Sequence, residues 1–277
     1  MLTVPGPQGP REVRLSSPSR VLFPRVGVTK LDLAEYLISA GDAFVTANGD
    51  RPMSLQRFPA GVDGEHYFSK NPPKGAPDYV RAVTVAYPSG REHPQLVIDE
   101  PAGAVWAAQM NTIVFHPWAS RAGAPDLPDE LRIDLDPQPG TDFDDARVVA
   151  IELRGERIFV DFSQANRDRT MAGAYSPRPL AHAPVSCPLD WNELEGADPA
   201  AFTILTVPER LRTTGDPWAT LHAAPGTIDT LLSWWQRDDA AGLGELPFPP
   251  DFPKMPGDPP RVQPSRAKAG RAETGQG

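Results

Sequence analysis

Hydrophobic and polar residues recur along this chain with two different periods, which predicts a mixture of helices and strands. Thr29 and Asp32 have the spacing of a helix N-terminal cap, and apolar residues follow at helical intervals as far as Phe44. The same reasoning predicts further helices at 104–110, 142–153, around Trp191 and at 227–237, the last burying Ile228, Leu231, Leu232 and Trp235. Period-two or short apolar runs predict strands at 52–58, 66–70, 82–87, 112–116, 131–136, 157–162 and 202–206.

This order of elements predicts an α+β fold without internal repeats. Residues 11–245 are expected to form the folded domain, preceded by a loose, Pro/Gly-rich stretch at 1–10. Residues 246–277 are proline-rich and then basic, so they are expected to be extended or disordered. No apolar run reaches the roughly 18 residues of a membrane span, so no membrane association is expected.

Composition narrows the chemistry. Hydrophobic residues make up 40% and charged residues 23% of the 277 residues, which is typical of a globular protein. Cys187 is the only cysteine, so an internal disulfide and a cysteine-built zinc cluster are both excluded. A reducing, cytoplasmic location is therefore the expectation. The five histidines lack the spacing of metal ligands along a helix.

Charge is distributed unevenly. The net charge of −9 argues against a protein that coats nucleic acid. Residues 1–30, however, contain one acid, Glu12, against the basic residues Arg11, Arg14, Arg20, Arg25 and Lys30. Such a region can bind phosphate even on an acidic protein, because salt screens charges beyond about 10 Å. The alternative is that these are ordinary solvated side chains.

Asp134 and Asp136 form the most informative pair of residues. Side chains alternate across a strand, so both carboxylates face the same way, and Asp161 on the next predicted strand offers a third. Like charges this close favour a cation between them, which points to a divalent metal site for phosphoryl or nucleotidyl transfer. A chance pair in an acidic chain is the alternative. An EF-hand calcium loop is excluded, because Pro139 stands where that loop needs glycine.

Several motifs, in order along the chain, resemble the polymerase domain of bacterial ligase D, a member of the archaeo-eukaryotic primase superfamily that works in non-homologous end joining. The resemblance covers nearly the whole chain and implies a primase-polymerase-like catalytic sheet flanked by helices, with a smaller N-terminal α/β part. The motifs are Arg20-Val-Leu-Phe-Pro, Arg51-Pro-Met-Ser-Leu-Gln-Arg57-Phe-Pro-Ala-Gly61, Phe115-His116-Pro117-Trp118, Asp134-Leu-Asp136-Pro, Phe159-Val-Asp161-Phe-Ser-Gln164, Tyr175-Ser-Pro-Arg178 and Thr206-Val-Pro208.

The resemblance implies a role for each candidate residue. Asp134, Asp136 and Asp161 would hold two Mg²⁺ or Mn²⁺ ions. Arg20 and Lys30 match basic residues that hold the 5′-phosphate of a broken DNA end. The nucleotide-contacting candidates are His116, Gln164, Arg178 and Arg154. Weaker candidates for DNA contacts are Arg57, Lys70 and Lys74. A structural histidine before a Pro-Trp turn is the alternative for His116.

One departure from the family pattern is large. Between the acidic pair and Asp161 the family has a loop of the type Ser-Gly-x-x-Gly-Leu-His, which binds the triphosphate, and nothing here resembles it. The seam lies between about 147 and 155, and roughly sixty to seventy residues are absent, a large share of a domain of about 100–150 residues. The catalytic sheet is therefore expected to be incomplete. Arg154 lies at the seam, and Leu180 stands where relatives often have a second arginine.

Three hypotheses follow. The chain is a polymerase-type nucleotidyltransferase acting on 5′-phosphorylated DNA ends with NTP or dNTP, a catalytically impaired end-binding relative, or a truncated product without function. An ATP-dependent DNA ligase and a Ku-type end-binding protein are the implied partners, and a nucleoid-associated cytoplasmic location is implied with them.

Overall fold

The computed structural model describes residues 1–86, 92–130, 132, 135, 140–154, 171–223, 227 and 229–242. Contacts divide the chain into two units, Met1–Ala224 and Pro225–Gly277. This boundary lies upstream of the division expected at 245/246. Within the described residues, no helix is long and apolar enough to cross a membrane.

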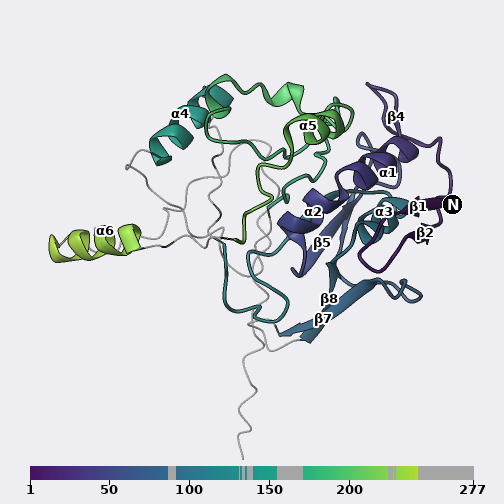
Figure 1. Ribbon diagram of the computed structural model, residues 1–277, viewed down its shortest axis with the longest axis horizontal. Helices are drawn as coiled ribbons and strands as arrows, with labels where there is room; N and C mark the ends of the chain where they lie inside the picture. Colours follow the sequence, from purple (N-terminus) through teal and green to yellow (C-terminus); the bar gives the residue numbers. More distant parts are fainter. Residues whose placement is uncertain are drawn as a thin grey trace, which may run out of the picture. The chain divides into compact units, whose positions relative to one another are not determined.

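A five-stranded sheet forms the centre of the first unit (Figure 1). β9 pairs antiparallel with β5 along its length, while β6 and β8 both pair with β5, and β7 continues the sheet beyond β8. The bounds are β5 Met53–Arg57, β6 Tyr67–Ser69, β7 Val80–Ala86, β8 Glu92–Ile98 and β9 Thr112–Pro117. The mixed fold and the strands expected at 52–58, 66–70, 82–87 and 112–116 are thereby confirmed within the described residues.

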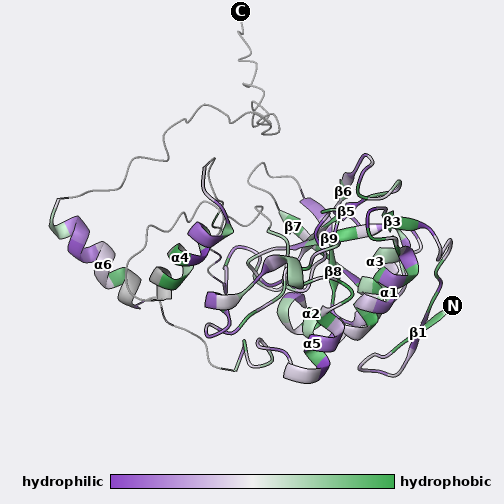
Figure 2. Cartoon of the chain, turned by 90° about the horizontal axis from the view of Figure 1, so that it is seen from above, coloured by the Kyte–Doolittle hydropathy of each residue, from purple (hydrophilic) through white to green (hydrophobic). Residues whose placement is uncertain are grey.

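Three helices pack together beside this sheet, and α3 contacts β8 and β9 (Figure 1). They are α1 Lys30–Ser39, α2 Gly41–Asn48 and α3 Pro101–Gln109. The predicted cap of α1 is confirmed: the Thr29 hydroxyl accepts the Asp32 N–H, and the Asp32 carboxylate accepts the Thr29 N–H. Hydrophobic side chains of these helices and of the strands form one buried cluster. Figure 2 shows hydrophobic residues on β8 and β9 and hydrophilic stretches on α4 and α6.

The single helix expected from Thr29 to Phe44 is wrong, because the helix breaks at Ala40. A Cβ atom at Gly41 would lie 2.5 Å from the Pro101 Cβ. Glycine at the break therefore lets α2 approach the first turn of α3 closely.

The N-terminal stretch is more ordered than its Pro/Gly content suggested. β1 Leu2–Val4 pairs with β2 Arg11–Val13, so the Pro/Gly-rich residues between them form a hairpin turn. Burial explains the order, because Val4 and Val13 are both fully buried. A second short pair, β3 Val21–Phe23 with β4 Val28–Thr29, leads into α1.

The remaining described elements are α4 Phe143–Arg154, η2 Leu194–Gly196, η3 Pro199–Ala201, α5 Val207–Thr214 and α6 Asp229–Ala240. α4 and α6 confirm the helices expected at 142–153 and 227–237. The helix expected near Trp191 is a turn followed by the short 3₁₀ segment η2. The strand expected at 202–206 is also wrong: the Thr206 hydroxyl accepts the Thr203 N–H at 2.9 Å and donates to the Ala201 carbonyl, and such local bonds favour a turn.

The predicted buried face of α6 is also wrong. Leu232 is 45% and Trp235 59% exposed. α6 lies in the second unit, Pro225–Gly277, which is too short to bury a large core of its own. Ile228 and the side chain of Leu231 lie outside the described residues.

Candidate active site

His116 lies near the end of β9, opposite Ser54 of β5. Its Nε2 atom is 3.3 Å from the Gln56 Oε1 atom, and its ring centroid is 5.4 Å from that of Phe68 on β6. The imidazole is half-buried. A histidine held by side chains from two neighbouring strands keeps one orientation while part of its ring still faces solvent.

The loop carrying Arg178 is fixed to the same strand. Phe115 directly precedes His116. Its carbonyl accepts the Gly173 N–H at 2.9 Å, and its N–H donates to the Ser176 hydroxyl at 2.9 Å. The loop thus completes the hydrogen bonds of β9 on the side away from β5. Arg178 is exposed, and its N–H donates to the Pro184 carbonyl at 2.7 Å. The hydrogen bond from the Phe115 N–H to the Ser176 hydroxyl thus joins the strand next to His116 to the loop two residues before Arg178.

Two further features hold this loop in place. The Tyr36 hydroxyl of α1 donates to the Tyr175 carbonyl at 2.7 Å, and Tyr175 adopts a left-handed φ of 60°. A Cβ atom at Gly173 would lie 2.9 Å from Pro117, so a larger residue does not fit against the end of β9. These constraints set the path of the chain on its way to Arg178.

Lys30 and Arg20, the predicted phosphate-binding residues, lie close together. Lys30 is the first residue of α1, its side chain is buried, and its Nζ donates to the Ser16 carbonyl at 3.2 Å. Burial lowers the pKa of the Lys30 ammonium, and the charges of Arg20 and Arg57 lower it further. Arg57 also stacks on the Tyr67 ring at 5.1 Å. The structure therefore gathers three cations that repel one another.

Within the described residues, none of these three cations forms an ion pair with a carboxylate. Their polar contacts are to carbonyl groups: Arg20 donates to Pro59 at 2.6 Å, and Arg57 to Met110 at 2.9 Å. A cluster of cations at the N-terminus of a helix lowers its own repulsion when an anion binds. The cluster of Lys30, Arg20 and Arg57 is called the cationic cluster below.

The predicted metal ligands Asp134, Asp136 and Asp161 lie outside the described residues, as does Gln164. Arg154 ends α4, and its side chain is not described. Among the residues that are described, no group of three or more His, Cys, Asp or Glu side chains could hold a metal ion. The strand expected at 131–136 is described only at Arg132 and Leu135, which lie in neither helix nor strand.

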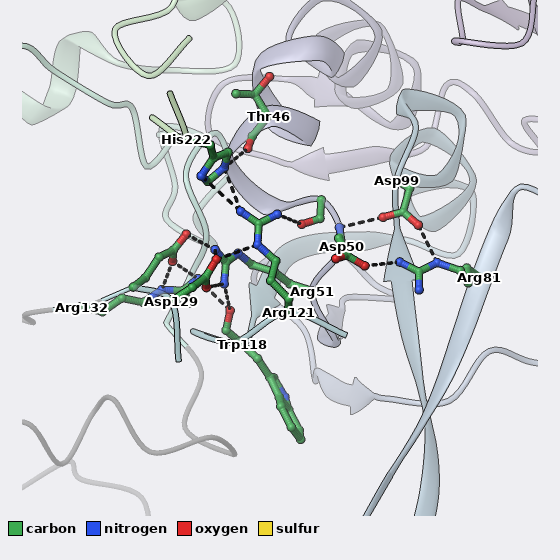
Figure 3. Close-up of polar contacts among 12 residues, drawn as sticks. Thr46, Asp50, Arg51, Arg81, Asp99, Trp118, Arg121, Asp129, Arg132 and His222 are labelled. Carbon is green, nitrogen blue, oxygen red and sulfur yellow. Dashed lines mark hydrogen bonds and ion pairs between the residues drawn. The ribbon is translucent and has the colours of Figure 1, made fainter. Parts of the chain in front are cut away.

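Figure 3 shows a charged network that local sequence patterns did not predict, built around residues just before the acidic pair in the sequence. Arg51, fully buried just before β5, donates to both Asp129 oxygens at 2.6 and 3.1 Å and also to Glu130. Arg121 also donates to Asp129, at 2.7 Å. Arg132 pairs with Glu130 at 2.7 Å. We call these five residues the arginine network.

The arginine network makes stability depend on pH. Burial raises the pKa of Asp129, but hydrogen bonds from Arg51 and Arg121 outweigh this and bring it below the ordinary 3.8. A carboxylate whose pKa is lower in the folded state than in the unfolded state stabilises the fold at pH values above the unfolded-state pKa. That stabilisation is lost as the pH falls through the folded-state pKa. We expect Asp129→Asn to be less stable than the wild type at pH 7 and to lose less stability between pH 5 and pH 3. Urea unfolding at both pH values tests this, and equal losses would contradict it.

Comparison with known proteins places the chain in a family. The family described as "LigD, primase-polymerase domain" matches residues 29–155 and 149–218. The multifunctional non-homologous end joining protein LigD of Mycolicibacterium smegmatis is 26% identical over 87% of this chain and 40% of its own length. The bifunctional LigD of Bacillus subtilis is 23% identical over 77% of this chain and 45% of its own length. The chain thus spans less than half the length of these relatives.

A solved structure shares the fold. The polymerase domain from Mycobacterium tuberculosis ligase D, determined in complex with DNA, matches with a TM-score of 0.60 and 22% sequence identity. The match covers 78% of this chain and all of the other.

The M. smegmatis alignment is longer than the part of this chain that it covers. The M. smegmatis alignment has 308 positions, and 87% of 277 residues is about 241, so about 67 positions have no counterpart here. The two segments matched by the family overlap at 149–155, within the range of about 147–155 given for the expected seam. With the family matched over more than half of the sequence, this chain belongs to the LigD primase-polymerase domain family.

Proposed function

We propose that this chain is a metal-dependent nucleotidyltransferase that adds nucleotides at 5′-phosphorylated DNA ends during non-homologous end joining. The observation that carries this proposal beyond family membership is the cationic cluster. A buried lysine at a helix N-terminus, influenced by two arginine charges and without an ion pair among the described residues, supports a site for a phosphate group. Residues 11–245 are proposed to contain the catalytic unit.

The proposed metal ligands are Asp134, Asp136 and Asp161. Carboxylate oxygens are the ligands that Mg²⁺ and Mn²⁺ prefer, so this donor set fits those ions. When bound, two such ions would stabilise charge on the transferred phosphoryl group and lower the pKa of the primer 3′-hydroxyl. Mg²⁺ or Mn²⁺ is therefore the proposed cofactor.

The protein's own residues position the nucleotide. His116 is held on β9 by contacts with Gln56 and Phe68, so it can contact a nucleotide without first having to be ordered. Arg178 presents an exposed guanidinium from a loop fixed to the same strand, and guanidinium groups bind phosphate through paired N–H donors. Gln164 and Arg154 are proposed as further nucleotide contacts on the strength of the family resemblance alone.

Primer extension tests the proposal. The purified chain, a gapped DNA with a 5′-phosphate, Mn²⁺ and NTPs or dNTPs are expected to give a primer lengthened by the gap. Extension is expected to fall when the 5′-phosphate is replaced by a hydroxyl. Failure to extend any such substrate would sink the proposed activity.

Replacing Lys30 with alanine is expected to remove most of the preference for a 5′-phosphate. A charge-assisted hydrogen bond is worth about 1.5–3 kcal/mol, so affinity for phosphorylated ends falls by about tenfold or more. Affinity for 5′-hydroxyl ends is expected to change little. Fluorescence anisotropy with the two DNAs measures both values.

The matched control is Arg14→Ala, which removes a neighbouring N-terminal charge outside the cationic cluster. Arg14 is exposed, so its loss is expected to weaken binding to both DNAs equally and by little. If the two variants behave alike, the basic N-terminal residues act only as a general positive surface.

A second function is favoured by the absence of about 67 positions that the M. smegmatis relative has. A chain without the triphosphate-binding loop would bind 5′-phosphorylated ends through the cationic cluster but would not extend them. Phosphate-dependent binding without extension identifies this end-binding relative. Unfolding without cooperativity would instead identify a truncated product. An ATP-dependent ligase and a Ku-type protein remain proposed partners.

A further inference from the structure

The segment just before the acidic pair is fixed by an unusual set of contacts. The Arg132 guanidinium donates to the Pro117 carbonyl at 2.6 Å and to the Trp118 carbonyl at 2.9 Å. It also pairs with Glu130, whose carboxylate accepts from Arg51. Arg132 therefore joins its own segment to the main chain directly after His116 (Figure 3).

Burial makes these contacts more than a surface ion pair. The Arg132 side chain is only 16% exposed and the Arg51 side chain is fully buried. The Arg132 guanidinium donates from Nε, Nη1 and Nη2, and a buried guanidinium bonded from all three nitrogens favours one geometry, because other arrangements leave more donors without partners. Surface arginines without such contacts sample many rotamers instead.

The chain distance from this anchor to the carboxylates is short. Asp134 lies two residues and Asp136 four residues beyond Arg132, and an extended chain advances about 3.3–3.6 Å per residue. The Asp134 Cα is thus within about 7 Å of the Arg132 Cα. Fixing Arg132 at the end of β9 restricts where both carboxylates lie relative to His116.

We infer that Arg132 is a positioning residue: it fixes the start of the acidic segment to the end of β9, with Glu130 holding its guanidinium and Arg51 holding Glu130. This inference rests on the proposed function for the metal-binding role of Asp134 and Asp136. Arg132 touches neither substrate nor metal in this role. Its loss leaves the ligands present but less well placed, and residues that orient metal ligands typically contribute about 10–100-fold in affinity or activity.

The test uses the full chain and Mn²⁺ as the probe, without DNA or nucleotide. Arg132→Met keeps the length of the side chain but removes its donors, and is expected to weaken Mn²⁺ binding, measured by electron paramagnetic resonance, about tenfold or more. Its kcat for primer extension is expected to fall more than its KM for nucleotide rises. Arg132→Lys, which restores a cation and part of the bonding, is expected to recover part of both losses.

Arg121→Met is the matched control. Arg121 also pairs with Asp129, but its other contacts are the Gly49 carbonyl and His222 rather than the end of β9 (Figure 3). It is expected to leave Mn²⁺ affinity unchanged. Equal losses of Mn²⁺ affinity in Arg121→Met and Arg132→Met would overturn the inference, because they would indicate general destabilisation.

Hydrogen exchange separates this inference from the proposed function. Mass spectrometry is expected to show faster exchange of the amides of 133–136 in Arg132→Met than in the wild type, with or without metal. Unchanged exchange would overturn the positioning role. If exchange rises but the wild type binds no Mn²⁺, the positioning of the segment stands and the proposed metal site fails.

Discussion

Asp136→Ala is expected to abolish primer extension on gapped, 5′-phosphorylated DNA. The proposed metal site relies on carboxylates that share two ions, and a metal ion supplies several kcal/mol of transition-state stabilisation. Each 1.4 kcal/mol is a factor of ten in rate, so a loss of at least about 10²-fold is expected. Single-turnover extension with Mn²⁺ measures it directly.

DNA binding separates a catalytic loss from a folding defect. The cationic cluster lies in the N-terminal part of the chain, so Asp136→Ala is expected to keep the affinity and the 5′-phosphate preference of the wild type. A variant that loses both extension and phosphate-dependent binding has lost its fold, and would say nothing about metal.

Asp144→Ala is the matched control for the acidic pair. Asp142 and Asp144 repeat the Asp-X-Asp pattern a few residues later, but Asp144 is 70% exposed and forms a surface ion pair with Arg147 at 3.1 Å. Its removal is expected to leave extension within about twofold of wild type, because exposed ion pairs contribute little. Equal losses in the two variants would mean that acidity near residue 140, rather than a metal site, supports the reaction.

Local patterns predicted the parts of the fold that local forces decide. The Thr29–Asp32 cap and the strand of β9 follow from residues within a few positions of one another, and both are confirmed. β8 was not predicted, because Pro94 stands inside it and proline is typical of strand edges rather than interiors. The structure shows why proline is tolerated there. β8 pairs with β5 only at Leu96, so Pro94 does not need an N–H to bond to β5.

The candidate site divides in the same way. The family resemblance implied Arg20 and Lys30 together, and in the structure the Lys30 N–H donates to the Arg20 carbonyl while the charges of Arg20 and Arg57 act on the Lys30 ammonium. The sequence did not predict that Gln56 would lie beside His116. Nor did it predict the arginine network, because Arg51 and Asp129 are 78 positions apart and no periodic pattern links them. Such long-range polar contacts arise from packing, which a single sequence does not display.

The placement of Asp134, Asp136 and Asp161 remains a prediction from the sequence. Strand alternation gives the two facing carboxylates, and the family resemblance adds the third. The structure adds two features among the described residues: the anchored Arg132, two positions before Asp134, and the strand carrying His116.

Arg51→Ala is expected to destabilise the protein by about 3–5 kcal/mol. Removing one partner of a buried ion pair leaves the remaining charges only partly compensated. Arg51 is fully buried, and its loss removes the buried guanidinium from Asp129 and Glu130, which keep only Arg121 and Arg132 as partners. Urea unfolding followed by circular dichroism measures the change in the free energy of unfolding.

Arg81→Ala provides the comparison, because burial is the main difference between the two sites. Arg81 also bridges two acids, Asp50 at 2.6 Å and Asp99 at 2.8 Å, but its side chain is 45% exposed. Exposed pairs contribute about 0–1 kcal/mol, so Arg81→Ala is expected to shift the free energy of unfolding by no more than that. Similar losses in both variants would mean that burial does not decide the strength of these bridges. A small loss for Arg51 alone would mean that water enters and solvates Asp129 and Glu130 once the guanidinium is gone.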